Sequence, residues 1–255
     1  MMPSLPKAFL AAPLAHRALH DLAEGRPENS IDAVRAALVH GYGIEIDVQL
    51  SADGAAMVFH DYDLGRLTHA EGPVRQRTCD ELRAIGLVGA ETHIPTLFEI
   101  LELVAGQVPI LIEIKDQDGA MGPDIGPLEQ AVADEVQAYA GPVAMMSFNP
   151  HSVAKMAELS TEVARGLVTS AYRLPDWPLD AGTCARLREI PDYDRVGASF
   201  ISHEVSDLNR ERVHALRDAG ADVLCWTVRS PSMEQEAREV VQNITFEGYL
   251  PSLDG

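Results

Sequence analysis

The order of the predicted elements constrains the fold of this chain more than any other feature. A short apolar strand is followed by an amphipathic helix, and this unit recurs about eight times along 255 residues. Several strands are continuous apolar runs, such as VPILIEI at 108–114 and DVLCWTV at 222–228, which is typical of parallel strands covered on both faces. A barrel of eight such units takes about 250 residues. The sequence therefore predicts an α/β fold, a TIM (β/α)₈ barrel, as a single domain over residues 1–255.

A doubly wound open sheet is the competing interpretation of the same alternation. No GxGxxG or GxxxxGK[ST] motif supports its nucleotide-binding form. The predicted strands are residues 9–15, 43–50 with 57–60, 108–115, 143–148, 163–169, 196–201, 223–228 and 244–250. The predicted helices are residues 30–40, 96–105, 126–139, 150–159, 180–190, 209–219 and 232–241.

One segment, residues 62–93, interrupts this rhythm after the second strand. It is far longer than an ordinary βα connection of about two to six residues. It contains Gly72-Pro73 and a short helical stretch at 80–85. Long βα insertions lie over the active-site face of a barrel. We therefore expect a small insertion that caps this face and shapes a substrate pocket.

The composition excludes some classes of partner and favours one compartment. The formal net charge is −19, which argues against general nucleic-acid binding and against docking on anionic lipid. Three cysteines lie far apart without a CxxC pair, so we expect a reducing, cytoplasmic location and no disulfide framework. The apolar run at 8–15 resembles a short signal peptide but is interpreted as the first strand, and no apolar run is long enough to span a membrane.

Charged side chains occur near the carboxyl ends of successive predicted strands, where a barrel carries its chemistry. Glu45 and Asp47 are two apart and therefore share one face of the second strand. Glu113 and Lys115 repeat this spacing in the third strand. A strand covered on both faces carries such residues only when they are paired or bound to a metal. The pattern therefore indicates a site rather than a solvated edge.

The residue types indicate phosphodiester chemistry. Three converging carboxylates repel one another unless a hard divalent cation, Mg²⁺ or Ca²⁺, lies between them. Nearby cations then complete a site for a phosphate oxyanion, and two imidazoles can serve as general base and general acid. We assign the metal ligands to Glu45, Asp47 and Glu113, the phosphate contacts to Arg17 and Lys115, and the acid–base pair to His16 and His60.

At these residues the sequence resembles the glycerophosphodiester phosphodiesterase family. The matching pieces follow the family's order from residue 16 to residue 228: His16-Arg17, Pro27-Glu28-Asn29-Ser30, Glu45-Ile-Asp47, Asp53-Gly54, His60-Asp61 with Leu64 and Arg66, Ile94-Pro95-Thr96-Leu97, Glu113-Ile-Lys115, Ser147-Phe148 and Trp226-Thr227-Val228. The resemblance implies a TIM barrel with an insertion after the second strand. It also implies metal-dependent hydrolysis of glycerophosphodiesters to glycerol 3-phosphate and an alcohol, with the roles assigned above.

Three departures from the family pattern concern the loops. Ala18 stands where the family usually has glycine after His-Arg, and the segment between residues 17 and 27 is longer. The chain ends in EGYLPSLDG, so the last barrel helix is expected to be short or missing. A homo-oligomer whose partner subunit covers that surface is a further expectation.

Several alternatives stay open at the level of sequence. The carboxylates can instead form ion pairs with Arg17 or Lys115 and bind no metal. Asn29 either contacts substrate or caps the first helix, and Trp226 either lines the pocket beside the alcohol group or packs in the core. His203 either touches substrate or lies in a surface loop.

The reaction itself also leaves alternatives. The nucleophile is water or the substrate's own 2-hydroxyl. Another diester, either a lysophospholipase D-like substrate or a polyol phosphodiester, is the first alternative to a glycerophosphodiester. A non-catalytic protein that binds a phosphorylated ligand is the second.

Overall fold

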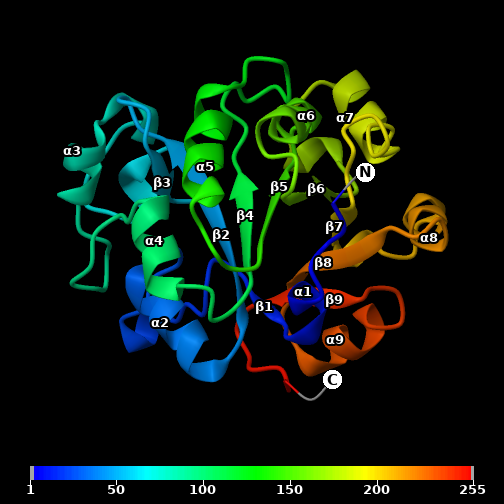
Figure 1. The fold of residues 1–255 in the computed structure, drawn as a ribbon, viewed down its shortest axis with the longest axis horizontal. Helices are drawn as coiled ribbons and strands as arrows, with labels where there is room; N and C mark the ends of the chain where they lie inside the picture. Colours follow the sequence, from blue (N-terminus) through cyan, green and yellow to red (C-terminus); the bar gives the residue numbers. More distant parts are fainter. Residues whose placement is uncertain (1–2, 254–255) are drawn as a thin grey trace.

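Eight parallel strands close into a barrel in the computed structural model, which describes residues 3–253 (Figure 1). Neighbouring strands pair in chain order, and the barrel closes because β1 pairs with both β2 and β9. A further short strand, β3 (Ala56–Val58), pairs antiparallel with the end of β2. The barrel strands are β1 (Leu14–Ala15), β2 (Gly43–Leu50), β4 (Ile110–Ile114), β5 (Val143–Ser147), β6 (Ala164–Thr169), β7 (Phe200–Glu204), β8 (Asp222–Val228) and β9 (Asn243–Phe246). The predicted TIM barrel is confirmed.

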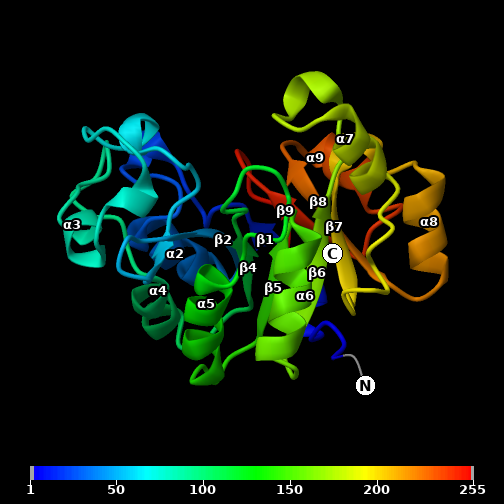
Figure 2. The ribbon, with the colours of Figure 1, turned by 90° about the horizontal axis from the view of Figure 1, so that it is seen from above.

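Helices cover the outside of the barrel, as both views show (Figures 1 and 2). Ser30 caps the first of them by accepting a hydrogen bond from the Ala33 amide at 3.1 Å, so the predicted helix start is confirmed. None of the helices in residues 3–253 is both long and apolar enough to cross a membrane. The outer helices are α2 (Ile31–His40), α4 (Leu97–Val104), α5 (Pro127–Gln137), α6 (Pro150–Leu159), α7 (Ala181–Arg188), α8 (Glu211–Asp218) and α9 (Pro231–Ala237), and short 3₁₀ turns occur at Leu22–Glu24, Leu64–Arg66, Val74–Gln76, Leu174–Asp176 and Val205–Asp207.

The period-two pattern of β2 and β4 sends apolar side chains outward and carboxylates inward. Ile44 and Ile46 belong to the core between strands and helices, whereas Glu45 and Asp47 line the cavity inside the barrel mouth. In the parallel register, Asp47 lies beside Glu113 of β4. The three carboxylates therefore meet because two adjacent strands carry the same alternation.

The predicted strand over residues 9–15 is wrong in its first half. Residues Ala8–Ala11 form a short helix, α1, and only Leu14 and Ala15 pair as a strand. Phe9 is fully buried in the cluster that fills the barrel interior. The Asn243 side-chain amide fixes this helix by donating to the carbonyls of Phe9 and Ala12, both at 2.7 Å. An apolar run alone does not separate a buried strand from a buried helix, which explains the error.

Two further strand boundaries differ from prediction. The predicted strand over residues 196–201 begins too early, because β7 spans Phe200–Glu204. Val196 and Ala198 precede it and are buried in the core between strands and helices, so their apolar character reflects packing rather than strand pairing. The last strand was predicted at 244–250 but ends at Phe246.

The insertion at 62–93 has a small core of its own. Leu64, Leu82 and Leu87 are buried there and pack with Phe59 beside β3. Its helix α3 (Cys79–Arg83) lies at the outer edge of the molecule, on the side of α4, in both views (Figures 1 and 2). From this segment only Tyr62 and Asp63 line the cavity at the barrel mouth, among the residues that the structure describes. Its role as a cap stays a prediction.

Candidate active site

A cavity of about 570 Å³ lies at the carboxyl ends of the barrel strands. Every site residue predicted from the sequence lines it, although these residues come from β2, β4, β8 and the segments that directly follow β1, β3 and β4. The predicted residues in its wall are His16, Arg17, Glu45, Asp47, His60, Glu113, Lys115 and Trp226. The structure therefore brings the whole predicted set to one place.

Three buried carboxylates form the centre of this cavity. Oxygen atoms of Glu45, Asp47 and Glu113 all lie within 4.8 Å of one another. Lys115 neutralises two of them, since its Nζ lies 2.8 Å from Asp47 Oδ1 and 2.7 Å from Glu113 Oε1. The predicted ion pairs therefore form, but they do not account for the third carboxylate.

Glu45 has no cation of its own within the described residues. Its Oε2 accepts a hydrogen bond from the Arg17 amide at 2.8 Å, whereas the Arg17 guanidinium binds Glu28 at 2.7 Å and reaches Asp47 only at 3.5 Å. Burial, together with repulsion from Asp47 and Glu113, raises the pKa of Glu45 well above its ordinary value. Excess negative charge on hard oxygen ligands is the environment that a divalent cation such as Mg²⁺ or Ca²⁺ fits.

The turn after β1 presents its backbone to Glu45. Arg17 and Ala18 have φ angles of 52° and 64°, in the left-handed region that favours glycine. This turn lets the Ala18 amide donate to the Glu45 carbonyl at 2.9 Å, beside the Arg17 contact. The conformation explains why a glycine would suit this position and shows that alanine also reaches it.

A network of ion pairs connects the two sides of the cavity. Arg66 binds Asp61 through Nε at 2.6 Å and binds Glu28 through Nη2 at 2.7 Å. Glu28 in turn binds the Arg17 guanidinium. Asn29, which is buried, donates to Asp47 Oδ2 at 2.9 Å, so it positions a predicted metal ligand rather than capping the helix.

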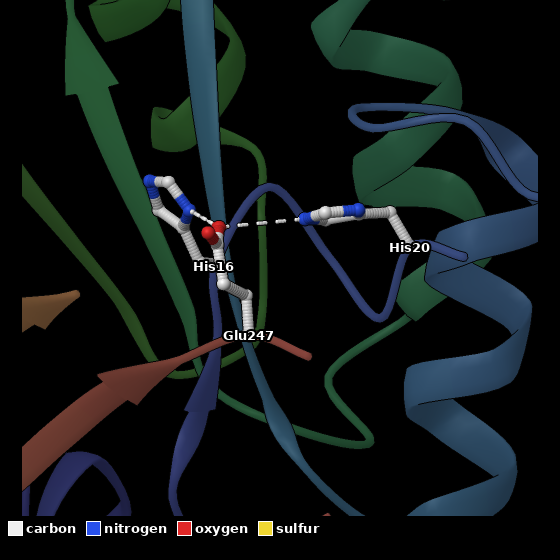
Figure 3. Close-up of side chains that lie close together, drawn as sticks. All are labelled: His16, His20 and Glu247. Atoms are coloured by element: carbon white, nitrogen blue, oxygen red, sulfur yellow. Dashed lines mark hydrogen bonds and ion pairs between the residues drawn. The ribbon is translucent and has the colours of Figure 1, made fainter. Parts of the chain in front are cut away.

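Each predicted catalytic histidine is held by a carboxylate. His16 Nδ1 donates to Glu247 Oε2 at 2.6 Å (Figure 3). His60 Nδ1 donates to Asp61 Oδ1 at 2.7 Å. In both rings Nδ1 is taken up by the carboxylate, and Nε2 is the nitrogen that makes no such contact. Burial and the nearby Arg17 lower the pKa of His16, although Glu247 acts in the opposite direction.

Comparison with known proteins identifies the family. The sequence model of the glycerophosphoryl diester phosphodiesterase family matches residues 16–244. The chain belongs to this family. A glycerophosphodiester phosphodiesterase of Caldanaerobacter subterraneus subsp. tengcongensis is 28% identical over 229 residues, which cover 86% of this chain and 87% of that relative. As a member of this family the chain is an enzyme of the glycerophosphodiester-hydrolysing class, which sets the non-catalytic alternative aside.

Solved structures share its fold. A phosphodiesterase of Oleispira antarctica, in complex with the product sn-glycerol-3-phosphate, matches with a TM-score of 0.77 and 23% identity over 94% of both chains. A glycerophosphodiester phosphodiesterase of Agrobacterium tumefaciens matches with a TM-score of 0.68 and 22% identity, covering 92% of this chain and 96% of that one.

Apolar side chains form another part of the phosphodiesterase cavity. Phe148 is at the centre of an aromatic group, with ring centroids 4.9 Å from Trp177 and 5.6 Å from Trp226. Trp226 donates from its indole nitrogen to the Ser202 carbonyl at 3.1 Å, which fixes the ring. Met146 also lines this part of the cavity. Trp226 is thus a wall residue as well as a packing residue.

Sequence reasoning missed the residues that hold the histidines. Asp61 and Arg66 lay within the family resemblance but received no role. Glu247 directly follows β9, at the same barrel end as His16, but the predicted strand over 244–250 placed it inside a strand. His203 was expected near substrate or in a surface loop, and both expectations are wrong because it is fully buried in β7.

Proposed function

We propose that this enzyme releases glycerol 3-phosphate and an alcohol from glycerophosphodiesters by acid–base catalysis on a substrate bound at a divalent-cation site. The observation that carries this proposal is the pair of carboxylate-held imidazoles, His16 and His60, in the wall of the cavity that holds the acidic cluster. A phosphodiesterase needs a group that takes a proton from the nucleophile and a group that gives one to the leaving alkoxide.

The two histidines are suited to these different tasks. The lowered pKa of His16 keeps its ring neutral near pH 7, which supports a role as general base. His60 then donates a proton to the alcohol oxygen as the phosphorus–oxygen bond to that alcohol breaks. The attacking oxygen belongs to water or to the substrate's 2-hydroxyl. A cyclic phosphate that accumulates transiently in phosphorus NMR would identify the second route.

Glu45, Asp47 and Glu113 are the residues that would hold the cation. A hard divalent ion, Mg²⁺ or Ca²⁺, supplies Lewis-acid polarisation of the phosphoryl oxygens when bound. Lys115 already contacts two of these carboxylates, and the Arg17 guanidinium reaches one. We assign both side chains to the phosphate, where they stabilise charge that develops on its oxygens during bond cleavage.

The aromatic group supports a proposal about which phosphodiester the cavity accepts. Trp226, Trp177 and Phe148 form an apolar wall of the cavity that the acidic cluster also lines. Such a wall suits the acyl chain that a lysophospholipid carries on its glycerol half and gives no hydrogen bonds to a second glycerol. This observation favours a lysophospholipase D-like substrate as the second candidate, ahead of a polyol diester.

Three further expectations accompany the proposal. Tyr62 and Asp63 line the cavity, which supports a pocket-shaping role for the start of the insertion within this single domain. The three cysteines are free, in keeping with a cytoplasmic location. A homo-oligomer stays a prediction.

The test measures release of glycerol 3-phosphate from glycerophosphocholine and glycerophosphoethanolamine, and release of choline from lysophosphatidylcholine, each with Mg²⁺, with Ca²⁺ and with EDTA. Wild-type enzyme is compared with His16→Ala and His60→Ala. We expect metal-dependent release that falls about 10²–10⁴-fold in each variant, which is the contribution of a general acid or base.

The contrary results are equally specific. Near-normal turnover in His16→Ala would remove this residue from the mechanism. Undiminished release of glycerol 3-phosphate in EDTA, from enzyme dialysed against the chelator, would refute the proposal that catalysis needs a bound divalent cation. Choline release from lysophosphatidylcholine at a higher kcat/KM than glycerol 3-phosphate release from glycerophosphocholine would favour the second candidate.

A further inference from the structure

We propose that His16, His20 and Glu247 form a second metal site, which takes a transition-metal cation of the Zn²⁺ type and is separate from the carboxylate cluster. Occupation of this site is expected to inhibit the enzyme. The binding itself follows from the geometry of these three side chains. Only the inhibition rests on the catalytic role proposed above for His16.

Three distant segments supply the ligands. His16 directly follows β1, His20 lies in the long loop before α2, and Glu247 directly follows β9. Their ligand atoms all lie within 4.8 Å of one another. Figure 3 shows both imidazoles directed at the same carboxylate, whose Oε2 is 2.6 Å from His16 Nδ1 and 3.6 Å from His20 Nε2.

An unsatisfied atom points to a ligand at this place. Nε2 of His20 is buried and has no hydrogen-bond partner among the described residues. A buried polar atom without a partner costs about 1–3 kcal/mol. A cation between this nitrogen and Glu247 would provide the missing partner, because a neutral imidazole nitrogen is a good metal ligand.

The ligand set selects a different metal from the acidic cluster. Two imidazole nitrogens and one carboxylate oxygen suit Zn²⁺, whereas three carboxylates suit Mg²⁺ or Ca²⁺. Tetrahedral ligands about 2.0–2.1 Å from Zn²⁺ lie roughly 3.3 Å apart. The present separations of 2.6 and 3.6 Å from the Glu247 oxygen lie on either side of that value, so small side-chain shifts would complete the site.

The surroundings orient the ligands and give access. Arg229 Nε donates to the other Glu247 oxygen, Oε1, at 2.7 Å, which leaves Oε2 for the imidazoles. His20 and Glu247 also line a second cavity of about 550 Å³. In the described chain this second cavity shares no lining residue with the substrate cavity, so an ion has an approach that bound substrate does not block.

Metal bound at Nδ1 of His16 would block its use as a base. The ring nitrogen Nε2 must then carry the imidazole proton and has no lone pair to accept another. The ion would also replace the hydrogen bond from His16 to Glu247 that holds the ring. Turnover should therefore fall as the site fills, whatever the concentration of the activating cation.

The experiment measures binding and inhibition separately. Co²⁺ is titrated into the enzyme in excess Mg²⁺, and the visible absorption of four-coordinate Co²⁺ reports nitrogen-ligated metal; Zn²⁺ should abolish it. Inhibition of glycerol 3-phosphate release by Zn²⁺ is then measured for wild type and His20→Gln. His40→Gln is the matched control, because His40 lines the same second cavity but lies outside the cluster.

We expect His20→Gln to keep its activity without Zn²⁺ and to raise the inhibition constant for Zn²⁺ by about 10–100-fold or more, a loss typical of a weakened metal site. The Co²⁺ absorption should be absent from His20→Gln, whereas His40→Gln should match wild type in both assays. Glu247→Gln offers a second variant for the binding assay, since its amide is a poorer metal ligand.

Two results would overturn the site: no Co²⁺ signal in wild type, or a Co²⁺ signal that His20→Gln retains unchanged. Equal Zn²⁺ inhibition of wild type and His20→Gln would overturn the proposed inhibition and assign it to the carboxylate cluster. A Co²⁺ signal that depends on His20 without any inhibition would uphold the site and instead contradict the catalytic role of His16. The proposed function and this inference therefore fail in distinguishable ways.

Discussion

Replacing Lys115 by methionine removes the cation that, among residues 3–253, contacts both Asp47 and Glu113. The Lys115 ammonium is nearly buried and lies 2.7 and 2.8 Å from these carboxylates. At an effective dielectric constant of about 20, each such pair attracts by about 6 kcal/mol. Desolvation of the ammonium cancels part of this attraction, so removing one partner of a buried pair typically costs about 3–5 kcal/mol. We expect Lys115→Met to lower the free energy of unfolding by that amount at pH 7 in EDTA.

The size of this loss should depend on pH. Burial raises the pKa of Asp47, but Lys115, His60 and Arg17 outweigh it and hold that pKa below its ordinary value. The stability gained from the ionised carboxylate is therefore present above the unfolded pKa of about 3.9 and is lost as the pH falls through the lower, folded pKa. Lys115→Met weakens this effect of the ionised Asp47. The difference in free energy of unfolding between wild type and Lys115→Met should therefore become smaller below about pH 4.

Urea denaturation followed by circular dichroism measures the difference. Lys155→Met is the matched control, since Lys155 on α6 forms only an exposed pair with Glu158 at 3.0 Å. That control should change the free energy of unfolding by less than about 0.5 kcal/mol. A loss below about 1 kcal/mol in Lys115→Met at pH 7 would refute the charge balance derived for the acidic cluster.

Three further predictions concern separate parts of the molecule. Asp61→Asn should lower kcat about 10²–10⁴-fold with little change in KM, because His60 loses the carboxylate that orients it; an unchanged kcat in steady-state assays would contradict this. Burial raises the pKa of Glu135 to about 7, so wild type should lose stability as the pH rises from about 4.5 to 7. Glu135→Gln should lack this pH dependence. By urea denaturation it should be about 1–3 kcal/mol more stable than wild type at pH 8. Phe9→Ala should cost about 3–5 kcal/mol by the same measurement, and a cost below about 1 kcal/mol would mean that α1 does not contribute to the barrel core.

The parts of the fold that could be predicted are those with a strong local pattern. The bounds of β2 agree with the predicted residues 43–50, because alternating isoleucines and carboxylates permit only an extended chain with one face outward. The site residues followed from the same reasoning. Parallel strands of a closed barrel bring their carboxyl ends together, so Glu113 could be placed near Glu45 and Asp47 without knowledge of any contact.

The parts that could not be predicted depend on contacts between distant residues. Helix α1 is apolar without a helical period, and only the filled barrel interior and Asn243 explain its shape. The ion pairs of Arg66 with Glu28 join residues 38 positions apart, across the fold of the insertion. No local sequence pattern predicts such an ion pair, since either residue alone resembles an ordinary surface charge.

The two histidines proposed as acid and base differ in how the fold positions them. His60 takes its carboxylate from the next residue, so this pair can form as soon as the local chain is ordered. His16 and Glu247 are 231 positions apart and meet only where β9 pairs with β1. That pairing joins two residues of β1, Leu14 and Ala15, to β9.

The N-terminal helix connects barrel closure to catalysis. Asn243 at the start of β9 binds the carbonyls of Phe9 and Ala12, so α1 holds β9 where the barrel closes. Loosening this contact would separate His16 from Glu247 while leaving His60, the acidic cluster and Lys115 in place. Activity should therefore be lost through opening of β9 before the barrel unfolds as a whole, because local opening needs less free energy than global unfolding.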